Sequence, residues 1–203
     1  MEHKNYETAL PEGYREALTV DAKNKKTSAL LTLASILITA AALVLSILII
    51  RPKDFLSNFN LVKYFITLAA LPAYVVLHEL THGAAYKLLT HQKLTFGLTL
   101  TVAFCGVPQI YVYRRTALIS LLAPFTVFTI IFGGAVLLLP EAWDKVYAAA
   151  LLSLHLGGCL GDLYDTFLYL TRFREPRTLM RDTGPTQVFL CRKNKGACGA
   201  GDR

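Results

Sequence analysis

Four long apolar segments constrain the fold of this chain more than any other feature. They cover residues 28–50, 64–86, 116–140 and 146–171, and the first and third contain no charged residue. At about 1.5 Å per helical residue, each can cross a hydrocarbon core about 30 Å thick. A composition that is 54% hydrophobic and 17% charged is also too apolar for an ordinary soluble domain. The sequence therefore predicts an α-helical membrane protein with four transmembrane helices.

Three regions follow from these segments. Residues 1–27 mix acidic and basic side chains and are expected to form a flexible or weakly helical N-terminal lead. Residues 28–172 form the transmembrane domain, and residues 173–203 form a basic tail whose end is expected to be disordered.

A β-hairpin is expected at about 93–113, between the second and third helices. Apolar residues alternate with polar ones from Leu94 to Phe104, and the run breaks at residues 105–108 before a second short arm. Such a hairpin can lie at the membrane interface, or border a cavity where its free edge holds an extended peptide. Both interpretations remain open at this stage.

The distribution of basic residues predicts the orientation. Of the 21 Lys and Arg residues, all but Arg51, Lys53, Lys63 and Lys145 fall on one side of the membrane if both termini are cytoplasmic. We therefore expect a multi-pass protein of the cell membrane with both termini in the cytoplasm. Topology and contact with the lipid bilayer account for the net charge of +7, so no nucleic-acid partner is expected. On this topology the four cysteines are expected to be free thiols.

The second apolar segment contains the sequence HELTH at residues 78–82. On a helix, His78 and His82 lie on one face about 6 Å apart along the axis, close enough to bind one ion. In zinc peptidases with the pattern H-E-x-x-H, the glutamate acts as general base on water, a role that here falls to Glu79. Ionisable side chains are costly inside a membrane, and a bound cation offsets much of that cost. The motif therefore predicts a Zn²⁺ site.

Catalytic zinc takes three protein ligands, and the fourth segment offers the third. His78 and Asp162 lie about 14 Å from the cytoplasmic ends of their helices, so they are expected at equal depth. Asp162 is the predicted ligand, whereas Asp165 is expected to reach water or a basic side chain. His155 is predicted to donate to an oxyanion or substrate, with a buried hydrogen-bonded histidine as the alternative. Pro124 is expected to kink its helix without a chemical role.

The sequence resembles the putative zincin peptidase family of small bacterial membrane proteins and, more distantly, the site-2 intramembrane metalloproteases. The residues that carry this resemblance are LHELTHGAAYKLL on the second segment, the β-rich stretch after it, LLAPF on the third and GD on the fourth. The resemblance covers roughly residues 60–185 and implies that His78, His82 and Asp162 bind zinc and that Glu79 is catalytic. Site-2 proteases carry an asparagine upstream of that aspartate, and His155 stands near its position.

These observations predict that residues 28–172 are a transmembrane metalloprotease domain. The expected reaction is hydrolysis of peptide bonds in a membrane protein or peptide substrate, within the bilayer or near its cytoplasmic side. A metal-binding regulator without catalysis would use the same ligands but would tolerate Glu79→Gln. A metal transporter would need polar residues across the whole bilayer, and the outer halves of the four segments have few.

Overall fold

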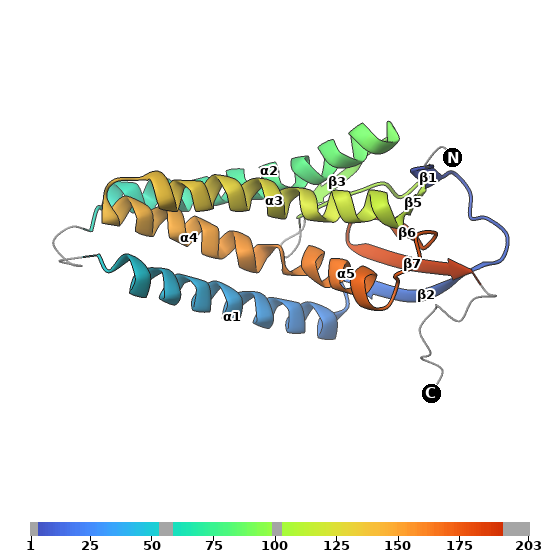
Figure 1. Cartoon of the computed structure of the whole chain (residues 1–203), viewed down its shortest axis with the longest axis horizontal. Coiled ribbons are helices and arrows are strands. Elements are labelled where there is room, and N and C mark those ends of the chain that lie inside the picture. Colours follow the sequence, from blue (N-terminus) through green and yellow to red (C-terminus); the bar gives the residue numbers. More distant parts are fainter. Residues whose placement is uncertain (1–3, 53–58, 99–102, 193–203) are drawn as a thin grey trace.

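The computed structural model describes residues 4–52, 59–98 and 103–192 as a helical bundle with a β-sheet at one end (Figure 1). Its helices are α1 (Lys25–Ile50), α2 (Leu61–Thr90), α3 (Arg114–Leu138), α4 (Ala142–Gly158) and α5 (Leu160–Thr171). Its strands are β1 (Tyr6–Glu7), β2 (Tyr14–Asp21), β3 (Thr95–Leu98), β4 (Ala103–Gly106), β5 (Tyr111–Tyr113), β6 (Leu179–Asp182) and β7 (Thr186–Arg192).

Three helices, α1, α2 and α3, are long and apolar enough to cross a membrane, and α4 with α5 makes a fourth if the bent pair is one span. No residue of α1 is fully buried, and many of its leucine and isoleucine side chains are exposed, among them Leu30, Leu48 and Ile49. The helix ends have local causes. The Asn24 side chain accepts hydrogen bonds from the first turn of α1, and Asn60 does the same for α2.

The segment expected as one helix over 146–171 is instead broken, and its two halves α4 and α5 meet at 48°. The break falls at Cys159, within a run that contains Gly157, Gly158 and Gly161, which lowers the helix propensity there. Gly157 also permits close packing. A Cβ at this position would lie 2.1 Å from the Thr39 hydroxyl of α1, and the Ser35 hydroxyl donates to the Gly157 carbonyl. As a result α1 lies directly against α4 (Figure 1).

The five-stranded antiparallel sheet has the order β1-β5-β6-β7-β2. The prediction of a flexible or weakly helical lead over residues 1–27 is therefore wrong, since β2 pairs with β7 along most of its length. The tail is likewise structured through Arg192. This sheet joins both ends of the described chain to the loop before α3, and pairing between such distant segments leaves no local signal in the sequence.

The hairpin between α2 and α3 differs from the prediction in its pairing. The alternating run splits into β3 and β4, which pair with each other, while β5 joins the large sheet instead. The turn of this hairpin lies outside the described residues. Gly83 on α2 brings the hairpin close, because a Cβ there would lie 2.7 Å from the Phe96 ring. After β4, the Val107 N–H donates to the Asp182 carbonyl, which ties the hairpin to the sheet.

The core lies where the sheet meets α2, α3 and α5. Its fully buried aromatic residues include Tyr86, Tyr169, Phe173 and Phe189, and the last two stack with ring centroids 4.8 Å apart. Cys105 and Cys159 are buried free thiols, whereas Cys191 is disulfide-bonded, so the expectation of free thiols fails for that residue. This core contains residues of both α2 and α5, such as Tyr86 and Tyr169, and so positions the two helices around the site described next.

Candidate metal centre

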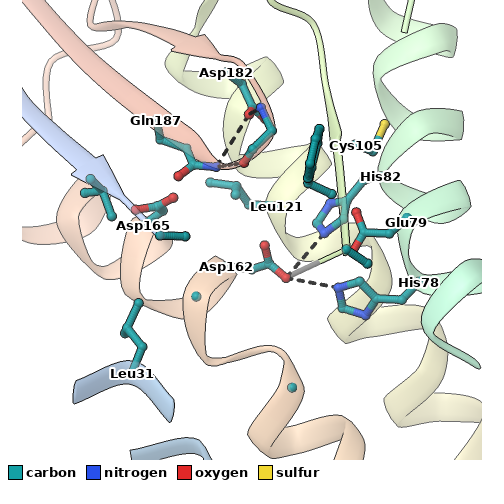
Figure 2. A pocket seen from close by; sticks show the side chains of 17 residues that line it. Leu31, His78, Glu79, His82, Cys105, Leu121, Asp162, Asp165, Asp182 and Gln187 are labelled. Carbon is teal, nitrogen blue, oxygen red and sulfur yellow. Dashed lines mark hydrogen bonds and ion pairs between the residues drawn. The ribbon is translucent and has the colours of Figure 1, made fainter. Parts of the chain in front are cut away.

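Three polar side chains from α2 and α5 converge in the interior of the bundle (Figure 2). The Nε2 atoms of His78 and His82 each lie 3.3 Å from Oδ2 of Asp162. Both histidines are buried, with 8% and 7% of their surfaces exposed. The α2 turn places the two imidazoles on one face, and the bend at Cys159 puts Asp162 in the first turn of α5 opposite them. The structure thus brings together the three residues expected to bind metal.

The neighbour of His82 on α3 determines which of its ring nitrogens carries hydrogen. His82 Nδ1 lies 2.8 Å from the Ser120 carbonyl oxygen, which can only accept, so Nδ1 is the donor. In a neutral ring Nε2 then carries a lone pair. Pro124 stands four residues after Ser120 and has no N–H, which leaves this carbonyl without its helical partner. Pro124 therefore frees the acceptor that orients His82.

His78 is oriented by a chain of side chains that ends on α3. His155 Nε2 faces the Phe125 carbonyl at 3.3 Å and the Thr129 hydroxyl at 3.1 Å, so Nε2 carries the hydrogen and Nδ1 accepts. The Tyr74 hydroxyl donates to that Nδ1 at 2.7 Å and can then accept from His78 Nδ1 at 3.2 Å. With its hydrogen on Nδ1, His78 also presents a lone pair at Nε2.

Two imidazole lone pairs and a carboxylate oxygen thus face one another with no hydrogen between them. Such a donor set is repulsive unless a cation or an added proton occupies its centre. In a tetrahedral zinc site with bonds of about 2.0–2.2 Å, ligand atoms lie about 3.3–3.6 Å apart, and the two His–Asp162 separations of 3.3 Å fall in this range. The ligand atoms of His78, His82 and Asp162 all lie within 4.8 Å of one another. The residues present therefore fit a zinc ion.

A second group of possible ligands consists of His78, His155 and Cys159. Its geometry is explained without metal. The His155 ring is engaged by Tyr74 on one side and by Phe125 on the other, and the Cys159 sulfur lies 3.4 Å from His155 Nδ1. We therefore interpret His155 and Cys159 as residues that position Tyr74 and His78, and not as metal ligands.

Glu79 lies beside the three converging groups in a cavity of about 180 Å³. The cavity is lined by residues from α2, β4, α5 and the β6–β7 hairpin, with further contributions from α1, α3, α4 and β2 (Figure 2). The Cys105 backbone N–H of β4 donates to the Glu79 carboxylate and holds it at the cavity edge. Burial raises the pKa of the Cys105 thiol to about 12, so this side chain remains a neutral thiol.

The far wall of the cavity carries Asp182. Its carboxylate accepts from the Tyr86 hydroxyl at 2.7 Å and from the Gly184 N–H at 2.8 Å. Burial raises the pKa of Asp182 to about 6, and these two hydrogen bonds oppose the shift. Asp182 is consequently an ionised, satisfied carboxylate at neutral pH.

His155 does not line the cavity. The residue is fully buried, and its ring contacts Tyr74, Phe125, Thr129 and Cys159. In this structure it supports His78 and presents no donor to the cavity. Sequence reasoning missed Tyr74, Ser120 and Asp182. Tyr74 stands four residues before His78 on the same helix face, a spacing that could have revealed it.

Fold and donor set together define a class: a helical bundle with a buried site suited to a divalent metal. The chain belongs to the family described as Putative zincin peptidase, whose model matches residues 71–176, more than half of its 203 residues. The matched region contains the three converging residues and Glu79. No curated protein and no solved structure matched the chain. Family membership supports a zinc metallopeptidase.

Proposed function

We propose that this protein is a membrane-embedded zinc metallopeptidase that cleaves membrane-associated proteins or peptides near the cytoplasmic side of the bilayer. One observation carries the proposal. His78, His82 and Asp162 present three acceptors to a common point, and both imidazoles are held in that state by hydrogen bonds at their other nitrogen. Glu79 supplies a base beside them.

The surface of the helices supports a membrane location. Large apolar side chains are exposed along α1, α2 and α3, including Leu30, Leu48, Ile66 and Ile130. The sheet lies at one end of the bundle, the same end at which the described chain begins and finishes (Figure 1). The excess of Lys and Arg favours the cytoplasm for that end. The cavity lies between the helices and this sheet, where a membrane substrate can meet water.

The residues divide the chemistry between them. His78, His82 and Asp162 would hold a zinc ion, which would supply Lewis acidity and allow water to lose a proton near neutral pH. Glu79 takes that proton and delivers it to the leaving amine, as a general base and then a general acid. Tyr74 and the Ser120 carbonyl keep the two imidazoles oriented through the reaction.

The edge of β4 supports binding of the substrate as an extended strand. β4 pairs with β3 on one side, and its Cys105 N–H points to Glu79 on the other. Ala103, two residues earlier on the strand, directs its backbone N–H to the same edge as Cys105 does. Next to this edge lies a groove of about 330 Å³ with an apolar lining that includes Val76, Leu80 and Phe104. A substrate strand on β4 would place its backbone at Glu79 and an apolar side chain in the groove.

Metal analysis combined with cleavage assays tests the proposal. Purified wild-type protein in lipid nanodiscs should contain about one zinc per chain and cleave a library of membrane-derived peptides. Glu79→Gln should retain the metal and lose cleavage, while Glu12→Gln, at an exposed turn, serves as the matched control. Cleavage by Glu79→Gln at the wild-type rate contradicts the role of Glu79. Metal binding without cleavage by the wild type favours a non-catalytic regulator.

The strand edge has its own test. Ala103→Pro removes one backbone N–H from the outer edge of β4, whereas Ala103→Val keeps it and serves as control. We expect Ala103→Pro to lower kcat/KM about tenfold with metal content unchanged. Equal kcat/KM for both variants contradicts binding of the substrate on this edge.

A further inference from the structure

Asp165 is the carboxylate in the cavity that no described residue satisfies. It lies on α5 one turn after Asp162, about 4.5 Å further along the helix axis, and lines the same cavity (Figure 2). Only 4% of its surface is exposed. Its Oδ1 is buried without a hydrogen-bond partner, and its charged neighbours are Asp162 and Asp182, both of the same sign.

The other carboxylates of the cavity are accounted for. Asp162 faces two imidazoles, Asp182 accepts from Tyr86 and Gly184, and Glu79 accepts from Cys105. A buried carboxylate oxygen without a partner is strongly unfavourable, so such a group either takes up a proton or is paired by a ligand that supplies the missing charge. Because Asp165 is the acidic residue of the cavity for which no partner is described, it is the candidate to bind a positively charged group of a ligand.

The charge of the cavity points the same way. Its described lining residues include Glu79, Asp162, Asp165 and Asp182 and contain no Lys or Arg. These four acidic groups outnumber the two charges of a divalent metal at the histidines, and that imbalance favours a positively charged group in the rest of the cavity.

We propose that Asp165 binds the side chain of a lysine or arginine in the substrate, close to the bond that is cleaved. This inference rests on the proposed function and gives its substrate class. An ammonium or guanidinium group fits one free carboxylate better than a second metal ion does, because a protein metal site of this kind needs about three ligands and the other carboxylates are engaged. Gln187, on the same wall, donates through its NH₂ to Gly184 and Asp182, which leaves its amide oxygen as a further acceptor.

The position of Asp165 predicts where the basic residue stands. α5 runs from Asp162 toward the sheet, so Asp165 lies on the sheet side of the metal ligands (Figure 1). With the sheet in the cytoplasm, this is the cytoplasmic side of the reaction centre. Transmembrane segments carry Lys and Arg just beyond their cytoplasmic end. A substrate cleaved near that end would bring such a residue to Asp165.

Peptide binding tests the inference without requiring turnover. Membrane-derived peptides, chosen without regard to cleavage, would each be made in three forms that differ at one scanned position, with lysine, norleucine or glutamate, and bound to zinc-loaded Glu79→Gln protein in nanodiscs. At one position lysine should bind about tenfold more tightly than norleucine, a difference of about 1.4 kcal/mol. Adding Asp165→Asn should reduce the preference to about twofold or less, while Asp144→Asn, at the opposite end of the bundle, should leave it unchanged.

Each outcome decides the inference. Loss of the lysine preference in Asp165→Asn supports the proposed role of Asp165. No lysine preference at any position overturns it, and this comparison needs only the Glu79→Gln protein if Asp165→Asn does not fold. A preference that survives in Asp165→Asn and Asp165→Ser also overturns it, as does a second zinc per chain that disappears in these variants. A lysine preference in binding, with no cleavage by the wild type, would refute the proposed peptidase activity and leave this recognition site standing.

Discussion

The two sides of the metal centre hold their histidines by different means. On the α3 side, His82 donates to a backbone carbonyl that belongs to the helix itself. On the α4 side, His78 depends on the Tyr74 hydroxyl and, through it, on the His155 ring. A backbone acceptor is fixed by the helix, whereas the Tyr74 chain needs three side chains in the correct rotamers. The comparison teaches that equivalent ligands of one motif can have unequal support.

Asp162→Asn should produce the largest effect, because Asp162 is the group that both histidines share. The amide removes the negative charge that helps to hold a divalent cation. We expect metal affinity to fall by at least about a hundredfold, with loss of cleavage, as measured by zinc competition with a chelator. Asp144→Asn is the control. Wild-type metal affinity in Asp162→Asn would show that α5 does not supply the third ligand. The comparison between the supports of His78 and His82 would then no longer concern a shared metal site.

Pro124→Ala tests the α3 side. The new N–H at position 124 can bind the Ser120 carbonyl and compete with His82 Nδ1. We expect metal affinity to fall about tenfold, in the range seen when outer-shell partners of metal ligands are altered. Pro72→Ala is a matched control, since Pro72 is an exposed proline inside α2. An equal effect of both substitutions would mean that proline removal acts through general helix geometry and not through Ser120.

Tyr74→Phe tests the α4 side. The substitution keeps the ring packed against Phe128 but removes the hydroxyl that links His78 to His155. We expect metal affinity to fall about fivefold, less than for Pro124→Ala, because water or a ring rotation can partly replace a side-chain acceptor. Phe128→Leu, which alters packing against Tyr74 and His155 but removes no hydrogen-bonding group, is the control. A larger loss for Tyr74→Phe than for Pro124→Ala would reverse the order of the two sides.

The sequence predicts the parts of this architecture that depend on local pattern. The apolar runs locate α1, α2 and α3 to within a few residues, and equal depth in two helices singles out Asp162 as the partner of His78. What it cannot predict depends on distant pairing. β2 meets β7 across almost the whole chain, and β1 and β5 are only two and three residues long, so neither has a recognisable alternation.

The residues that orient the metal ligands likewise include features that the sequence can reveal and features that it cannot. Pro124 is visible in the sequence, but its consequence is a free carbonyl at Ser120, and a backbone acceptor has no residue type to recognise. Tyr74 is visible too, four residues before His78, yet the sequence does not reveal that His155 on another helix receives its hydrogen bond. For Asp165, the sequence predicts contact with water or a basic side chain, and this is wrong: the residue is buried, and its Oδ1 has no hydrogen-bond partner among the described residues. That result depends on the neighbours that α5 and the sheet bring around it.

Thr129→Val should have the smallest effect on metal affinity. It distinguishes whether the Phe125 carbonyl alone orients His155 or whether the Thr129 hydroxyl is also needed. His155 Nε2 faces both the Thr129 hydroxyl and the Phe125 carbonyl, so valine leaves one acceptor of similar distance. If the carbonyl alone fixes the ring, metal affinity should change by less than about twofold. Thr126→Val is the control, because its hydroxyl bonds only its own helix. A loss as large as that of Tyr74→Phe would show that Thr129 orients His155, and the chain behind His78 would then consist of side chains throughout. The difference between the two sides would be sharper still, because one ligand would depend on a carbonyl made available by a proline and the other on four side chains that must be placed together.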